Sequence, residues 1–150
     1  GAQGAKGDKG DPGTANVLSK TYQASEITWT SATEFAVNHK RGTINIPKLT
    51  KDIADNGTVL VYAGLLFENT TWTALPTSFT ESGQVRYWGF GYKTGTITIR
   101  YSNSANTMPG NPTIPFKVVL IPGNPMGRKA APDIDYNNWE AVRDYYKLSD

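Results

Sequence analysis

Hydrophobic and polar residues alternate over much of the chain, in short runs separated by turn-forming residues. In residues 96–101 (TITIRY), Ile97, Ile99 and Tyr101 fall on one face of an extended chain and polar residues fall on the other. This period of two predicts a strand with one buried face. Residues 58–64 (TVLVYAG) are apolar almost throughout, which indicates a strand at the centre of a sheet.

The same criteria predict strands along the rest of the chain. The clearest further runs are residues 43–46, 84–92 and 116–121, and the weaker ones are 18–23, 26–30, 35–38 and 71–75. Lys93-Thr94-Gly95 joins two of the predicted strands as a hairpin. Short connections favour antiparallel pairing. We therefore expect an all-β fold, an antiparallel β-sandwich or jelly-roll-like domain.

Two segments break the β pattern and predict short helices. The first is a single helical turn at residues 50–54, with Thr50 as its N-cap. The second is an amphipathic C-terminal helix at residues 137–148, in which Asn137 stands three residues before a glutamate, as in a capping box. Its apolar stripe consists of Trp139, Val142 and Tyr146. We expect this stripe to dock the helix on the β domain.

The chain opens on a collagen-like repeat, with glycine at every third position. The repeat glycines are Gly1, Gly4, Gly7, Gly10 and Gly13. The period ends near residue 15, so the sequence predicts a Gly-X-Y leader at 1–15 and a β-sandwich domain with its C-terminal helix at 16–150. Such a repeat forms either a triple-helical stalk or an extended single-chain leader. Because the visible repeat is short and contains a single proline, we favour the monomeric leader over a homotrimer.

Composition excludes several classes of protein. The chain contains no cysteine, which excludes a disulfide scaffold, a thiolate metal site and a cysteine nucleophile. The formal net charge is +2 and no run of Lys or Arg exceeds two residues, so we expect no nucleic-acid partner. The sequence has no apolar run of the roughly 18–20 residues that a membrane-spanning helix needs.

Catalytic and metal-binding motifs are weak throughout the sequence. His39 is the single histidine and stands in a polar, turn-prone stretch, so we expect an exposed loop residue rather than a general base. Asp52, Asp55 and Asn56 could offer oxygen ligands to calcium, but their spacing is not that of an EF-hand. We expect no enzyme, no cofactor and no metal site.

Four aromatic residues are candidates for ligand contact. Trp88, Phe90 and Tyr92 are spaced by two, so their rings point to the same face of a strand, and Trp72 lies in another predicted strand. If this face is exposed, it is a candidate for stacking on glycans or for contact with a partner. The alternative is that the face belongs to the core.

Several stretches together resemble a known group of bacterial proteins. They are GAKGDKGDPGTANV at 4–17, IPKLTKDIADNGTVLVY at 46–62, WTALP at 72–76, FKVVLIPG at 116–123 and DYNNWEAVRDYYKL at 135–148. With these, the chain resembles the collagen-like-repeat surface lipoproteins of Bacteroidota. The resemblance implies a lipid anchor upstream of Gly1 and a location at the outer membrane, facing the cell surface. The expected function is a non-enzymatic interaction or structural module, as a subunit of an outer-membrane complex. The alternative is a glycan-binding module.

Overall fold

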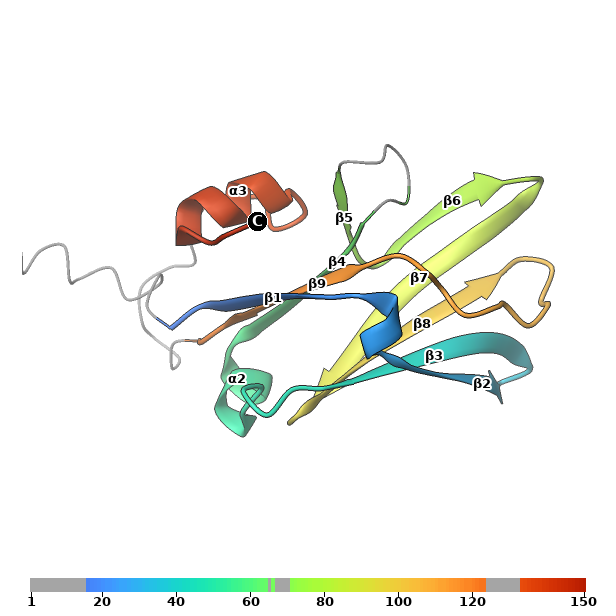
Figure 1. Ribbon diagram of the computed structural model, residues 1–150, viewed down its shortest axis with the longest axis horizontal. Helices are drawn as coiled ribbons and strands as arrows, with labels where there is room; N and C mark the ends of the chain where they lie inside the picture. The colour runs from blue at the N-terminus through green and yellow to red at the C-terminus, as the bar shows by residue number, and fades with distance from the viewer. Residues whose placement is uncertain (1–15, 65, 67–70, 124–132) are drawn as a thin grey trace, which may run out of the picture.

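Nine strands form two antiparallel sheets in the computed structural model, which describes residues 16–64, 66, 71–123 and 133–150 (Figure 1). The four-stranded sheet has the order β1 (Leu18–Tyr22), β9 (Phe116–Ile121), β4 (Thr58–Gly64) and β5 (Trp72–Ala74). The five-stranded sheet has the order β2 (Thr28–Glu34), β3 (Val37–Asn45), β8 (Thr96–Asn103), β7 (Gln84–Lys93) and β6 (Thr77–Glu81). The predicted all-β sandwich is confirmed. The predicted leader, with its five repeat glycines, lies outside the described residues.

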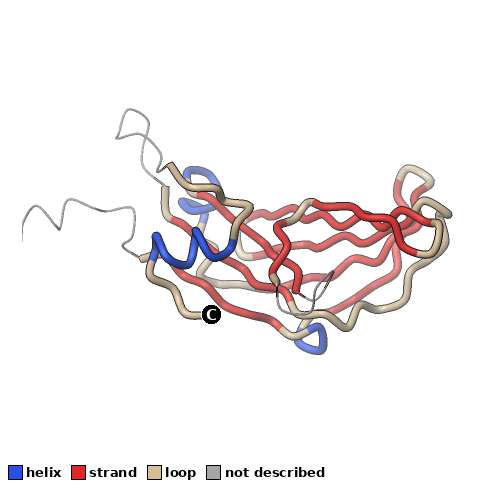
Figure 2. The backbone as a smooth tube through the Cα atoms, turned by 90° about the horizontal axis from the view of Figure 1, so that it is seen from above, coloured by secondary structure: helices blue, strands red, loops and turns tan. Residues whose placement is uncertain are grey.

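Three short helices accompany the strands in the described part of the chain. They are η2 (Ala24–Glu26), α2 (Lys51–Asn56) and α3 (Trp139–Tyr146). Figure 2, turned by 90° from Figure 1, shows that α3 lies outside the strands. Thr50 caps α2 as predicted, because its side chain accepts a hydrogen bond from the backbone N–H of Ile53.

The core between the sheets follows the predicted alternation of side chains. On β8, Ile97 and Ile99 are fully buried. Phe116 on β9 lies 5.9 Å from Trp29, centroid to centroid. A Cβ atom at Gly42 would lie 2.4 Å from the ring of Trp29, so a glycine is required where this large ring crosses the sheet.

The C-terminal helix covers the outer face of the four-stranded sheet. Trp139, Val142 and Tyr146 are all buried against that sheet, so the predicted docking of the apolar stripe is confirmed. The helix is shorter than expected. Asn138, not Asn137, is its N-cap and accepts a hydrogen bond from the backbone N–H of Ala141 at 3.2 Å.

Because α3 covers one face of the four-stranded sheet and the second sheet covers the other, its central strands are buried on both sides. Val118 faces the core between the sheets and Val119 faces α3, and both are buried. This double burial explains why the sequences of β4 and β9 are apolar almost throughout, rather than alternating.

Two sequence predictions of strands are corrected, and one strand was missed. Residues 35–38 do not begin a strand, because 35 and 36 form a two-residue turn between β2 and β3. Strand β2 begins two residues later than predicted, after η2. Strand β6 was missed because its sequence, TSFTE, is mostly polar; it is an edge strand in which no residue is fully buried.

Candidate functional site

Three of the four aromatic candidates lie together, on the inner face of the five-stranded sheet. Trp88 is 5% exposed and stacks on Tyr101, with ring centroids 3.9 Å apart. Phe90 is half-buried and packs against the core, while Tyr92 at the end of β7 is 43% exposed. The shared face is therefore the core side of the sheet, and Trp88 does not reach solvent as a binding platform.

Trp72 lies apart from the other three, on β5 of the four-stranded sheet, and helps to enclose a lysine. The Nζ atom of Lys117 lies 4.6 Å from the ring centroid of Trp72 and 3.7 Å from that of Trp139. Lys117 is only 1% exposed, and burial lowers its pKa. The position of Trp72 supports a structural role, in which the ring helps to hold α3 on the sheet.

The prediction that His39 is an exposed loop residue is wrong. His39 is fully buried on β3. The strand extends to Val37 because Phe35 and Ala36 complete the hairpin turn in two residues. The polar stretch around His39 therefore pairs on both sides, with β2 and β8, instead of forming a loop.

A network of charged side chains surrounds His39 on the outer face of the five-stranded sheet. The ring Nδ1 lies 3.1 Å from the carbonyl oxygen of Val37, which can only accept a hydrogen bond. Glu34 pairs with Arg41 at 2.8 Å and lies 3.7 Å from Arg100. Glu34 is therefore held mainly by Arg41, and the side chain of Arg100 remains 48% exposed.

A groove of about 570 Å³ opens on the same outer face, over β6, β7 and β8. Its lining includes Val37, Ser78, Tyr87, Gly89, Arg100 and Ser102. Tyr87 is 45% exposed, and a Cβ atom added at Gly89 would meet nothing within 4 Å. We call this surface the sheet groove. The sequence did not predict this groove, because the residues of β8 that stand beside Tyr87 and Gly89 are set by the register of the two strands.

The turn between β2 and β3 presents an aromatic side chain to solvent. Phe35 is 98% exposed and has φ 51°, and Ala36 has φ 65°. Val37 and Met108 are also exposed, by 39% and 40%. We call residues 35–37 the hairpin tip. No signal in the sequence pointed to it, because an isolated phenylalanine in a β-rich chain resembles any other core residue.

The hairpin tip is tied to the loop after β8 by Asn106. Its side-chain Nδ2 donates to the carbonyl oxygen of Ala36 at 2.9 Å, and its Oδ1 accepts from the backbone N–H of Asn38 at 2.8 Å. The Asn38 side chain in turn donates to the Asn106 carbonyl oxygen at 2.9 Å. These bonds hold the turn in one position relative to the sheet.

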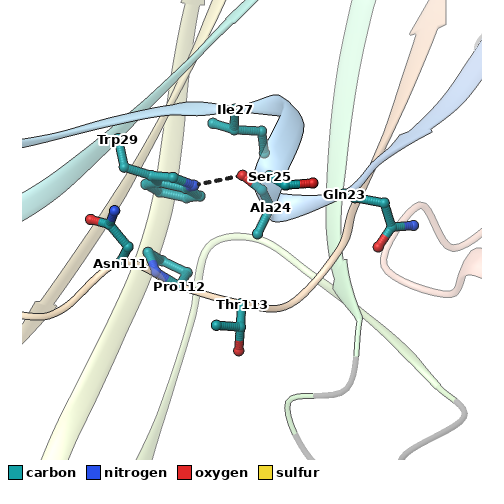
Figure 3. Close-up of a pocket in the computed structure, with 8 residues that line it drawn as sticks. All are labelled: Gln23, Ala24, Ser25, Ile27, Trp29, Asn111, Pro112 and Thr113. Atoms are coloured by element: carbon teal, nitrogen blue, oxygen red, sulfur yellow. Dashed lines mark hydrogen bonds between the residues drawn. The ribbon is translucent and has the colours of Figure 1, made fainter.

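A second, uncharged pocket of about 460 Å³ lies beside Trp29 (Figure 3). It is bounded by η2 on one side and by residues 111–113 on the other. The indole Nε1 of Trp29 donates to the carbonyl oxygen of Ala24 at 3.0 Å, so the polar atom of the ring is already engaged. With its ring also packed over Gly42, Trp29 is mainly a structural residue.

Other candidate chemistry is accounted for by local structure. Asp52 accepts a hydrogen bond from the side chain of Asn56, and Asp55 pairs with Lys51. Among the described residues, no group of three or more His, Cys, Asp or Glu side chains is arranged to hold a metal ion. None of the described helices is long and apolar enough to cross a membrane.

Comparison with known proteins adds no relative to this picture. The chain matches no protein-family model, no curated protein and no solved structure.

Proposed function

We propose that this chain is a non-enzymatic interaction module of the bacterial outer envelope, and that the hairpin tip is its protein contact. In this proposal the module faces the cell surface as a subunit of an outer-membrane complex, on a leader that is lipid-anchored upstream of Gly1. The resemblance to collagen-like-repeat surface lipoproteins supports the location, and the geometry of the hairpin tip supports the mode of binding.

The observation that carries the proposal is the exposed Phe35 in a left-handed backbone conformation. A two-residue hairpin turn with positive φ at both positions favours Asn or Gly. A bulky residue there costs roughly 1–2 kcal/mol. The turn between β6 and β7 has the same form and uses Ser82-Gly83, with φ 53° and 78°. Phe35 therefore serves neither turn stability nor the core, which is the pattern expected of a functional residue.

The surroundings of Phe35 suit an anchor residue. Aromatic side chains are enriched among the residues that dominate binding energy at protein interfaces. Because Asn106 already holds the turn in place, little backbone freedom would be lost when a partner binds. The exposed side chain of Val37, two residues further along the chain, would extend the apolar contact.

The position of the tip favours a protein partner over the membrane that carries the leader. In Figure 1, the hairpin of β2 and β3 lies at the opposite end of the long axis from the start of β1. A leader anchored in a membrane would enter near β1, so the hairpin tip would face away from that membrane. We therefore propose a partner protein with an apolar socket that accepts the phenyl ring.

The substitution Phe35→Asn separates binding from folding. Asparagine tolerates positive φ better than phenylalanine, so we expect the thermal midpoint to stay the same or to rise. We expect a stoichiometric protein partner to purify with the full-length lipidated protein from its native membrane, and we expect the variant to lose it. Quantified co-purification and thermal unfolding measure the two effects.

The matched control is Ser82→Asn, which introduces the same residue at the equivalent position of the turn between β6 and β7. This variant should keep the partner. The proposal fails if Phe35→Asn retains the partner, or if the partner is lost equally in both variants.

A further inference from the structure

We propose that the sheet groove binds a carboxylated sugar ring, as a terminal or repeating acidic residue of a glycan. The inference concerns a second site and does not depend on the protein contact proposed for Phe35. It rests on the register of β7 and β8, on the charge that surrounds Arg100, and on the hydroxyl groups beside the groove.

The register brings four complementary residues to neighbouring positions of the outer face. Tyr87 and Gly89 point outward from β7, two residues apart, and their partners on β8 are Ser102 and Arg100. Directly opposed side chains on antiparallel strands stand about 5 Å apart at Cβ. An aromatic ring, an open backbone position, a guanidinium and a hydroxyl therefore occupy an area close to that of one pyranose ring.

The open position at Gly89 allows close approach. Because a side chain there would project into empty space, its absence lets a flat ligand approach the sheet backbone. The half-exposed ring of Tyr87 stands beside this floor. A sugar ring could thus pack its apolar C–H face on Tyr87 while it lies over Gly89, since aromatic side chains offer an apolar face together with a polar edge.

Arg100 supplies the preference for a negative charge. Its guanidinium has a planar array of donors that matches a carboxylate. Glu34 lies 2.8 Å from Arg41 and 3.7 Å from Arg100, so Arg41 is the closer counter-ion of Glu34. Two arginines share this one carboxylate, and the local excess of positive charge belongs to the half-exposed Arg100.

The surroundings of the groove favour a saccharide over an acidic polypeptide. The groove lies over β6, β7 and β8, and β7 is hydrogen-bonded to a strand on each side. An extended peptide therefore cannot add a strand on the groove's central strand. Ser78 and Ser102 line the groove, and hydroxyl groups can donate to and accept from the hydroxyls of a sugar.

The test is a quantitative binding assay on immobilised oligosaccharides that end in glucuronate, galacturonate or N-acetylneuraminate. Each is paired with its carboxyl-reduced neutral counterpart, and poly-L-glutamate serves as the acidic polypeptide. We expect at least one acidic sugar to bind the full chain tenfold or more tightly than its reduced form. Arg100→Gln should weaken that binding at least tenfold, and Tyr87→Ala should weaken it several-fold.

Lys93→Gln is the matched control. Lys93 lies on the same outer face of β7, about 20 Å from Tyr87 along the strand, and its loss removes the same charge outside the groove. This variant should bind within twofold of the parent. If Arg100→Gln does not fold, Arg100→Lys keeps the charge without the planar fork and should still bind several-fold more weakly.

Three results would overturn the inference. The first is that no acidic sugar binds more tightly than its reduced counterpart. The second is that Lys93→Gln weakens binding as much as Arg100→Gln, which would indicate non-specific attraction of charge. The third is that poly-L-glutamate binds more tightly than every acidic sugar and with the same dependence on Arg100, which would assign the groove to an acidic polypeptide.

Discussion

Lys117 is a cationic residue in the interior of the molecule. Its ammonium group is buried between the rings of Trp72 and Trp139 and has no hydrogen-bond partner among the described residues. Two effects oppose each other there. Desolvation disfavours the charged form, while the two ring faces attract it by about 0.5–2 kcal/mol. Burial is the main cause of the lowered pKa of Lys117, and the ammonium group has no hydrogen-bond partner in the described part of the chain that would offset its desolvation.

We therefore predict that Lys117→Met stabilises the protein by about 1 kcal/mol near neutral pH, because a buried ion is replaced by an apolar side chain of similar length. Chemical denaturation of parent and variant measures the difference. The matched control is Lys20→Met, which removes a lysine that lies over the Tyr22 ring at 4.8 Å but is exposed. That control should change stability by less than about 0.5 kcal/mol.

The difference in stability between the parent and Lys117→Met should depend on pH. The pKa of Lys117 lies below its ordinary value of 10.5 in the folded state. Between the two values the unfolded chain binds more protons, so the stability of the parent rises with pH in this window. The advantage of Lys117→Met should be largest below the folded pKa and should shrink as the pH approaches 10.5. Raised tyrosine pKa values, as at Tyr22, act in the opposite direction in both proteins and cancel in the difference. An advantage that grows with pH would contradict this account.

The surroundings of two buried polar residues could not be predicted from the sequence. His39 and Lys117 are polar residues that the fold buries. His39 stands in a polar stretch that gives no sign of burial, whereas Lys117 stands in an apolar run that does not show what surrounds its ammonium group. The environment of each is built from residues far apart in sequence. His39 on β3 contacts Arg100 on the neighbouring strand β8, and the ammonium group of Lys117 contacts the rings of Trp72 and Trp139. The sheet groove has the same origin, because the pairing of Gly89 with Arg100 depends on register.

At the scale of elements, most strands were predictable because their periodicity matches their burial. The alternation in residues 96–101 and the apolar runs of β4 and β9 led directly to the correct strands. The turn at Phe35 and Ala36 was not predicted, since it contains none of the usual turn residues. The pairing of the flanking strands imposes positive φ on both residues. A bulky residue in a left-handed backbone conformation distinguishes the hairpin tip from the turn between β6 and β7, which uses Ser82 and Gly83.

Helix α3 packs on the four-stranded sheet through a buried tryptophan, Trp139. Trp139 is 2% exposed and meets Tyr62 edge to face, with ring centroids 5.7 Å apart. Trp139→Ala should therefore lower the free energy of unfolding by about 3 kcal/mol, as expected for the loss of a large buried aromatic side chain. Urea denaturation measures the loss. Glu140→Gln, at an exposed position of the same helix, should leave stability nearly unchanged. A loss below about 1 kcal/mol for Trp139→Ala would show that α3 does not depend on this contact.

At the scale of the whole molecule, the two proposed contacts lie on one side of the sandwich. The outer face of the four-stranded sheet is covered by α3. The outer face of the five-stranded sheet carries the sheet groove, and Val37 belongs both to the lining of the groove and to the hairpin tip. This difference between the two outer faces supports a module that binds partners through the five-stranded sheet and its hairpin, while the C-terminal helix packs on the four-stranded sheet.

Site-specific photo-crosslinking from position 35 tests the central proposal most directly. The full-length lipidated protein would carry p-benzoylphenylalanine in place of Phe35 in its native membrane, with the same substitution at Ser82 and at Lys93 as controls. We predict one dominant crosslinked protein from position 35 that neither control position captures, because the benzophenone at position 35 would sit in the partner's apolar socket. No crosslinked protein from position 35, or the same products from all three positions, would contradict the role of the hairpin tip as a protein contact.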